Sequence, residues 1–307
     1  MAKISNHLTL SNLFFFLIFI NMAPYLFKSI FLQYSKMLEP RTKVAQIDIT
    51  GVLTNSTRTI KYLKKYFEDD SIKAILLKLE TPGGATGTAQ AIFNEIKALK
   101  KEFPKPIVAI TENICVSGGY YIAIAADHII CAPGSALGSI GVLIPYQFKL
   151  KQFVEGYNIQ YKPVSSGAYK MALDPFLDNT PEQTAMLQDL TDNIYEQFTQ
   201  DVATQRKLSL SKTKEWANGK IFTGQQALKL NMVDELGSIS NAIQRIKEKA
   251  LIEGKIEWIR PVPKSPFAKL FGQADEDEDS ALDTLASWFG DKIFSKLEER
   301  FAGIVSR

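Results

Sequence analysis

A serine followed by two glycines is the strongest candidate for a nucleophilic site in this 307-residue chain. The segment V-S-G-G-Y-Y, residues 116–121, lies between the apolar run P-I-V-A-I and the small-residue run I-A-I-A-A. Ser117 precedes a predicted helix, so the N–H of Gly118 would point close to the serine hydroxyl, as an oxyanion donor must. The alternative is that Ser117 only caps the helix, which is the commoner role of a serine at such a position.

A second glycine-rich turn follows an apolar strand candidate and opens a helix. It reads L-E-T-P-G-G-A-T-G over residues 79–87 and contains Pro82, Gly83 and Gly84. The first N–H groups of a helix have no partner within it, so such a turn can bind an oxyanion or a phosphate. The Lys-Ser or Lys-Thr pair of a nucleotide-binding P-loop does not follow. A plain turn is the competing interpretation.

A nucleophilic serine needs a base that accepts its proton, and the two histidines of the chain are poor candidates. His7 precedes the apolar N-terminal segment, and His128 starts a predicted strand, where it could be a surface residue. The other known solution is a desolvated lysine. Lys170 stands out, because its neighbours in V-S-S-G-A-Y-K-M-A-L-D-P-F are mostly small or apolar. The alternative is a surface lysine on a loop.

Buried strands that alternate with amphipathic helices are predicted to position these residues. Apolar runs at 44–49, 71–79 and 106–110 predict strands, and a helix is predicted between the last two. The apolar face of that helix comprises Ala89, Ile92, Phe93, Ile96 and Leu99. An order of strand, glycine turn, helix and strand is typical of an α/β fold.

The same pattern continues towards the C-terminus. Thr180-Pro181-Glu182-Gln183 combines a hydroxyl cap, a proline at the first helical position and a glutamine at the capping-box position. This combination predicts the start of a long helix. Further strands are predicted at 128–132, 139–144, 159–164 and 255–260, and further helices at 148–157, 223–230 and 239–251.

The charge balance and the cysteine count exclude several classes of protein. The 36 basic and 33 acidic residues leave a net charge of +3 with no dense basic stripe, so nucleic acid is not an expected partner. Cys115 and Cys131 are too few for a disulfide framework and form no Cys/His cluster. We interpret them as buried packing thiols and expect no metal and no cofactor.

The N-terminal segment, residues 1–32, is predicted to be an uncleaved membrane anchor. Residues 13–20 read L-F-F-F-L-I-F-I, and continuing to Leu32 reaches the roughly 20 residues that a spanning helix needs. A secretory signal peptide is the alternative, although no convincing cleavage site follows. Residues 33–42 are interpreted as a linker, and residues 43–260 as the folded domain.

The last part of the chain, residues 261–307, differs in character from the domain. It begins as a proline-rich linker and continues into five consecutive acidic residues at 275–279. An amphipathic helix is predicted after them, with an apolar face formed by Leu282, Leu285, Phe289, Ile293, Leu297 and Phe301. This helix would dock on the domain or on a second subunit, or lie on a membrane.

Four motifs in this order resemble peptidase family S49, of the signal peptide peptidase A type. They are T-P-G-G, I-C-V-S-G-G-Y-Y-I-A-I-A-A-D, G-S-A-L-G-S-I-G-V and S-S-G-A-Y-K-M-A-L-D-P-F. The resemblance extends from about residue 44 to about residue 250, and the length with a single anchor resembles the short, single-copy form. It implies an α/β fold of the ClpP/crotonase type.

The resemblance also implies roles for individual residues. Ser117 would be the nucleophile and Lys170 the general base, while Gly84 and Gly118 would supply the oxyanion N–H groups and Ser139 would orient the lysine. The chain departs from the family at Thr81, where serine is frequent, at Met171, where a polar residue is frequent, and at His128, where a basic residue is typical. The last departure argues further against a histidine base.

The resemblance implies a membrane-anchored serine endopeptidase that acts on remnant signal peptides and on small membrane or misfolded proteins. It would form a ring-like homo-oligomer, bind peptide substrates and contact membrane lipid through its anchor. Two alternatives are an acyl-CoA enzyme of the ClpP/crotonase fold and a non-catalytic membrane scaffold.

The sequence predicts a single-pass protein of the inner or plasma membrane, but it gives two answers for the side on which the domain lies. Lys28, Lys36, Arg41 and Lys43 follow the anchor, whereas only Lys3 precedes it, which favours a cytoplasmic domain. The usual placement in the family is extracytoplasmic, and this is the placement that we expect.

Overall fold

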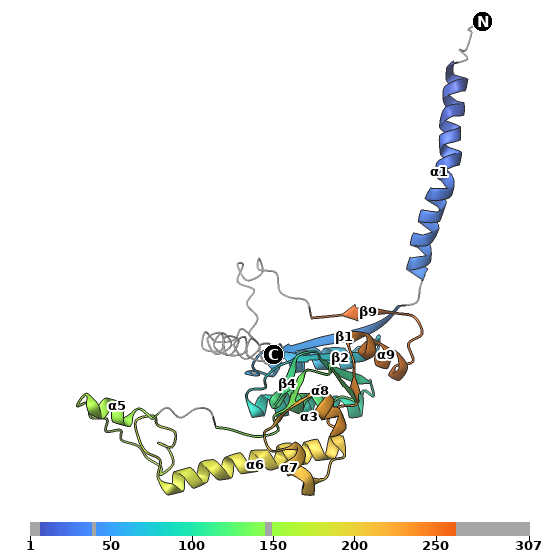
Figure 1. The fold of residues 1–307 in the computed structure, drawn as a ribbon. Helices are drawn as coiled ribbons and strands as arrows, with labels where there is room; N and C mark the ends of the chain where they lie inside the picture. Colours follow the sequence, from blue (N-terminus) through green and yellow to red (C-terminus); the bar gives the residue numbers. More distant parts are fainter. Residues whose placement is uncertain (1–6, 39–40, 145–148, 262–307) are drawn as a thin grey trace, which may run out of the picture.

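A computed structural model describes residues 7–38, 41–144 and 149–261 of the chain. The body contains a six-stranded sheet in the order β8-β5-β3-β2-β1-β9, in which all neighbouring strands are parallel (Figure 1). A three-stranded sheet has the order β4-β6-β7, with only the last pair antiparallel. The predicted α/β class is therefore confirmed, whereas the acidic run and the predicted C-terminal helix lie outside the described residues.

The strands are short apart from two long central ones. Their bounds are β1 Arg41–Thr50, β2 Ile72–Glu80, β3 Ile107–Thr111, β4 Ile114–Val116, β5 His128–Cys131, β6 Ala136–Gly138, β7 Ile221–Thr223, β8 Glu235–Leu236 and β9 Lys255–Ile259. The helices are α1 His7–Leu38, α2 Thr57–Glu68, α3 Thr86–Glu102, α4 Gly118–Ala123, α5 Lys151–Gly156, α6 Pro181–Arg206, α7 Thr213–Trp216, α8 Gly224–Lys229 and α9 Ile239–Lys249, with a 3₁₀ turn at Leu210–Lys212.

Helices cover both faces of the large sheet. Side chains of a strand point alternately to its two faces, so apolar residues on both faces of a strand can be buried under helices. In β2, Ile75 and Leu77 pack into the core that contains the apolar faces of α2 and α3. Ala74 and Leu76 pack into a smaller core closed by α9. Burying a side chain such as leucine or isoleucine fully stabilises the fold by roughly 1.5–3 kcal/mol, so this two-sided burial holds β2 firmly at the centre of the molecule.

Most of the elements predicted from periodicity and capping are confirmed. All five apolar residues predicted for one face of α3 are buried. The helix predicted to begin at Thr180 is α6, and Thr180 and Gln183 form the expected capping box. The strands predicted at 44–49, 71–79, 106–110, 128–132 and 255–260 correspond to β1, β2, β3, β5 and β9.

Two predicted strands, at 139–144 and 159–164, are wrong. Neither segment pairs with a strand among the described residues, and β6 instead ends at Gly138. Val164 is fully exposed. Both segments contain β-branched residues, but a strand needs a neighbour along its length, and among the described residues the backbone bonds of 139–144 to 219–220 involve only Ser139 and Ile140.

Residues 149–180, here called the arm, extend away from the two sheets. Figure 1 shows α5 and the loops that follow it at the far end of α6 from the body. Four of the five buried residues of α6 are near its C-terminal end, namely Phe198, Thr199, Val202 and Ala203. The fifth is Gln183, which donates a hydrogen bond to Ala168 O of the arm at 2.8 Å. The helix is thus held by the body at one end and carries the arm at the other.

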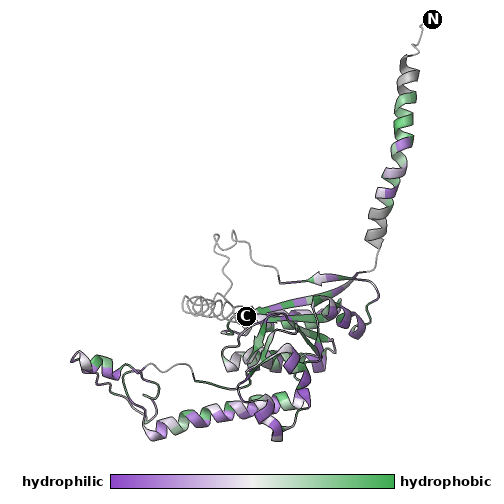
Figure 2. Ribbon diagram, in the orientation of Figure 1, coloured by the Kyte–Doolittle hydropathy of each residue, from purple (hydrophilic) through white to green (hydrophobic). Residues whose placement is uncertain are grey.

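Helix α1 leads away from the body at the N-terminus (Figure 1). Figure 2 shows its apolar stretch in green, and the side chains from Leu13 to Ile20 are exposed. Among the described residues, no helix combines the length and the apolar character needed to cross a membrane, so the predicted anchor is not shown. Helix α1 ends at Leu38 and β1 begins at Arg41, so these elements occupy most of the segment interpreted as a linker.

Candidate active site

Ser117 occupies a sharp turn between β4 and α4, and its side chain does not cap the helix. The backbone has φ = 53° and ψ = −125° there, a conformation that is unfavourable for a residue with a side chain. Strain of this kind costs about 1–3 kcal/mol and is characteristic of functional sites. The alternative of a capping serine is therefore wrong, because the hydroxyl makes no capping hydrogen bond.

The two glycine-rich turns lie side by side because Thr81 pairs with Cys115. Thr81 N donates to Ile114 O at 2.9 Å, and Val116 N donates to Thr81 O at 3.2 Å. The Glu80 carboxylate reinforces this junction by accepting hydrogen bonds from the N–H groups of Glu112, at 2.8 Å, and Ile114, at 3.2 Å. The sequence did not predict these hydrogen bonds to the Glu80 carboxylate. The one available signal was that Glu80 directly precedes T-P-G-G.

Gly83 makes the closest approach to the candidate nucleophile. A Cβ atom at this position would lie 2.8 Å from Gly118 N, 2.8 Å from Ser117 Cβ and 3.1 Å from Ser117 Oγ. The backbone of Gly83 has φ = 92°, which favours glycine for a second reason. There is no room for a methyl group here, so only glycine lets the two turns approach each other this closely at Ser117 and Gly118.

Gly84 is fixed beside Gly83 by the backbone of Leu53. Leu53 N donates to Gly83 O, and Ala85 N donates to Leu53 O, both at 2.8 Å. This pairing does not use the N–H of Gly84. Across the described ranges, neither the N–H of Gly84 nor that of Gly118 donates a hydrogen bond to the protein, so both predicted oxyanion donors are available.

Gly83→Ala is expected to reduce peptide hydrolysis at least about 100-fold, the effect of losing one oxyanion donor, because its methyl group would clash with Ser117 Cβ and Gly118 N and force the two turns apart. Gly87→Ala is the matched control, since a Cβ at Gly87 meets nothing within 4 Å. This change in α3 should leave activity unaltered and stabilise the helix by up to about 1 kcal/mol. Peptide turnover and thermal unfolding of both variants check the prediction, and equal activity of the two would contradict it.

Ser139 lies in the strand pair next to Ser117. Val116 is in register with Gly138, and Ser117 N donates to Gly138 O at 2.8 Å. Ser139 also has a positive φ, 50°, and its own N–H donates to Lys220 O at 2.7 Å. The structure therefore brings together Ser117, Gly84, Gly118 and Ser139 of the predicted site residues.

The structure does not bring Lys170 to this group. Lys170 is exposed on the arm, in a turn where its N–H donates to Gly167 O at 3.1 Å. Within the described part of the chain, no hydrogen bond joins it to Ser117. The nearby acid, Asp174, accepts hydrogen bonds from Tyr161 Oη and Phe176 N and forms no described ion pair with Lys170.

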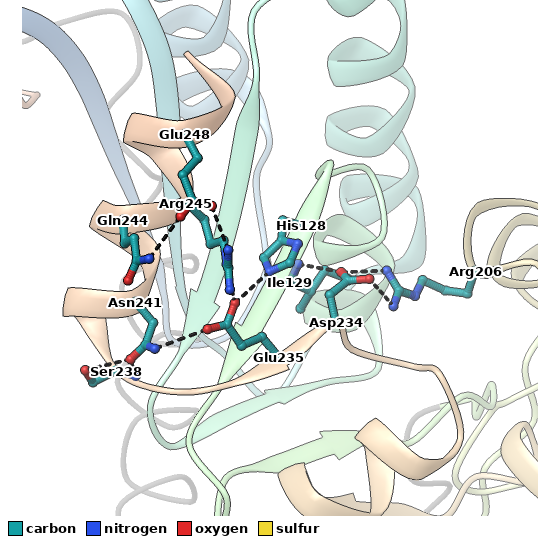
Figure 3. A network of polar contacts seen from close by, with 10 residues as sticks. All are labelled: His128, Ile129, Arg206, Asp234, Glu235, Ser238, Asn241, Gln244, Arg245 and Glu248. Carbon is teal, nitrogen blue, oxygen red and sulfur yellow. Dashed lines mark hydrogen bonds and ion pairs between the residues drawn. The ribbon is translucent and has the colours of Figure 1, made fainter. Parts of the chain in front are cut away.

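His128 belongs to a polar network that joins β5, β8 and α9 (Figure 3). Its Nε2 lies 3.0 Å from Glu235 Oε2, and Glu235 also accepts hydrogen bonds from Arg245 and Asn241. These bonds, that from Arg245 first, hold the pKa of the Glu235 carboxyl below its ordinary value.

The strand register separates His128 from the glycine turns. His128 is level with Val108 of β3 and therefore with Leu76 of β2, five residues before Thr81. At about 3.3 Å per residue, this corresponds to roughly 16 Å along the sheet. His128 is thus not placed to act as the base of Ser117.

The two cysteines pack in the core as predicted, with Cys115 1% and Cys131 0% exposed. Burial raises the pKa of both thiols, that of Cys131 to about 11. No group of potential metal ligands occurs among the described residues.

Comparison with known proteins points to a peptidase family. The model of a family described as "Peptidase family S49" matches residues 99–253, which include Ser117, Ser139 and Lys170. Over 206 residues, the chain is 39% identical to a Synechocystis protein named "Putative protease", covering 66% of this chain and 73% of that protein. It is 28% identical to "Putative signal peptide peptidase SppA" of Enterococcus faecium, covering 70% and 66% of the two chains. It is 29% identical to "Serine protease SPPA, chloroplastic" of Arabidopsis thaliana, covering 71% and 31%.

Proposed function

Because this chain belongs to peptidase family S49 and is therefore a serine peptidase, we propose that it is an endopeptidase with a Ser117/Lys170 dyad. One observation carries the proposal. Ser117 is held in a strained turn, its hydroxyl does not cap α4, and Gly83 lets the turn that contains Gly84 pack directly against it. A structural serine gains nothing from this arrangement, whereas a nucleophile needs it to reach a substrate carbonyl.

In the proposed reaction, Ser117 Oγ attacks the carbonyl carbon of the scissile peptide bond and transfers its proton to the neutral amine of Lys170. The carbonyl oxygen becomes an oxyanion that accepts hydrogen bonds from Gly84 N–H and Gly118 N–H. The intermediate then expels the amine product, which takes the proton from the lysine. A water molecule, activated by the same lysine, hydrolyses the acyl-enzyme, while Ser139 orients the lysine.

We further propose that the lysine of one chain serves the serine of a neighbouring copy in a homo-oligomer. The exposed position of Lys170 on the arm supports this arrangement. Large apolar side chains are also exposed there, and clusters of such side chains are characteristic of contact surfaces. They are Phe153, Tyr157, Ile159, Tyr161, Val164, Tyr169 and Leu173. A ring-like assembly would bury them.

A fluorophosphonate probe tests the proposal against its alternatives, because only an activated serine reacts with it at an appreciable rate. We expect the full-length protein to be labelled at Ser117, as identified by mass spectrometry of the labelled peptide. An acyl-CoA enzyme of the ClpP/crotonase fold or a non-catalytic scaffold would remain unlabelled. Heat-denatured protein is the control for non-specific labelling.

We also propose that α1 attaches the protein to a membrane and that its substrates are signal-peptide remnants and other small membrane or misfolded proteins. The exposed apolar side chains of α1 support attachment. Deleting residues 1–38 should abolish co-flotation with phospholipid vesicles while peptide hydrolysis persists. Equal flotation of the two forms would contradict the attachment.

Protease digestion of intact spheroplasts tests the proposed extracytoplasmic domain, which would be degraded before lysis.

A further inference from the structure

The two adjacent tyrosines of α4 bind to different parts of the molecule. Tyr120 is fully buried and donates a hydrogen bond to Met232 O, just after α8, at 2.7 Å. Tyr121, 1% exposed, donates to Asp201 Oδ2 of α6 at 2.5 Å. Burial, followed by the hydrogen bond to Asp201, raises the pKa of Tyr121, so its hydroxyl remains a donor. Tyr120 thus fixes α4 to the body, and Tyr121 joins α4 to the helix that carries the arm.

The contact between Tyr121 and α6 combines aromatic packing with hydrogen bonds. Its ring stacks on Phe198 with a centroid distance of 4.4 Å and meets Phe93 of α3 edge-on at 5.1 Å. Gln90 Nε2 of α3 lies 3.4 Å from Tyr121 Oη and donates to Gln197 Oε1 of α6 at 2.9 Å. One turn of α6, residues 197–201, therefore packs on α3 and α4 with Tyr121 at the centre of the contact.

This contact contributes to the position of the arm, together with the pair of hydrogen bonds from Arg206 to Asp234 at the C-terminal end of α6, because the helix projects from both as a lever. The helix rises about 1.5 Å per residue, so about 30 Å separate Asp201 from Pro181. A tilt of α6 by about 5° at its contact with α3 and α4 would displace Pro181 by about 3 Å. Gln183 ties that far end to the arm, as described above. A change in the contact between α4 and α6 would therefore be amplified at the arm.

We propose that Tyr121 is a positioning residue for the peptidase reaction, which fixes the direction of α6 and thereby places the arm with Lys170. This inference rests on the proposed function, and it applies equally whether the lysine reaches the serine of its own chain or that of a neighbouring copy. Tyr121 connects the helix that follows Ser117 to the distant segment that carries the proposed base.

Hydrolysis by full-length variants tests the proposal, with Tyr120→Phe as the matched control. Tyr121→Phe and Asp201→Ala each remove the hydrogen bond to α6. Each should lower kcat about tenfold or more, since a misplacement of about 1 Å can cost up to about 100-fold, while KM changes less than about twofold. Tyr121→Phe/Asp201→Ala should lose no more than either single variant, because both break one contact. Asp201→Asn retains an acceptor and should recover most of the rate.

Tyr120→Phe also removes a buried hydrogen bond, but not one to α6. It should lower the melting temperature while kcat of the folded enzyme stays within about twofold of the original. Wild-type kcat in Tyr121→Phe and Asp201→Ala would overturn the inference, and so would equal losses in Tyr120→Phe and Tyr121→Phe. Should Tyr121→Phe fail to fold, the Asp201 variants alone decide. Activity remaining in Ser117→Ala would instead contradict the proposed function.

Discussion

Ser117→Ala is expected to abolish peptide hydrolysis, with a loss in kcat of roughly 10⁶-fold, the magnitude known for removal of a nucleophilic serine. The change deletes one oxygen from a half-buried side chain that makes no capping hydrogen bond. The free energy of unfolding should therefore change by about 1 kcal/mol or less. Turnover of a fluorogenic peptide and denaturant unfolding of the same preparation measure the two quantities. Hydrolysis at the original rate would remove Ser117 from its role.

Ser117→Gly provides a second, stricter form of the same experiment. Glycine tolerates φ = 53° better than serine does, so this variant should be equally inactive but no less stable than Ser117→Ala. An inactive protein that is as stable as the original cannot owe its inactivity to unfolding. A strong loss of stability in Ser117→Gly would show that the hydroxyl is structural.

Lys170→Arg should lose about 100-fold or more in kcat although the positive charge is kept. A base must give up its proton, and a guanidinium does not do so below about pH 12. General-base assistance contributes about 10²–10⁴-fold. Lys162→Arg, a nearby change of the same kind on the arm, is the control and should leave the rate unaltered. Near-normal turnover by Lys170→Arg would show that the lysine is only a positioning cation.

The same variant reveals whether the base comes from another chain. Ser117→Ala and Lys170→Arg are each expected to be inactive alone. If neighbouring copies share sites, mixed oligomers would contain sites with both functional residues, about one quarter of all sites after random mixing of equal amounts. Recovery of activity on mixing supports sharing. Two inactive proteins that stay inactive after verified subunit exchange would place the dyad within one chain.

The elements with strong local signals were predictable from the sequence. The face of α3 follows from five apolar residues at helical spacing, and the start of α6 follows from the Thr180–Gln183 capping box. Strand β4 was missed because three residues are too few for a periodicity. The segments 139–144 and 159–164 resemble strands in composition, but pairing depends on neighbours that are distant in sequence.

The candidate site also contains residues that the sequence could predict and relations between residues that it could not. Ser117, Gly118 and Gly84 follow from glycine turns whose geometry is local, and the structure places those turns together. The role of Gly83 was not predicted, because it depends on the crossing of two turns separated by more than 30 residues in the sequence. The separation of Lys170 from Ser117 could not be read from motifs, since the motifs give residue types but not the direction in which α6 carries the arm.

The burial of both native thiols makes the chain a convenient background for fluorescence labelling. Cys115 and Cys131 are the only cysteines in the sequence, and their raised pKa and burial in the core keep them from reacting with maleimides. A dye on Tyr169→Cys, next to Lys170, would therefore label the arm selectively. Paired with a fluorescent phosphonate on Ser117, it would report by energy transfer how far the arm lies from the nucleophile, within one chain or between two.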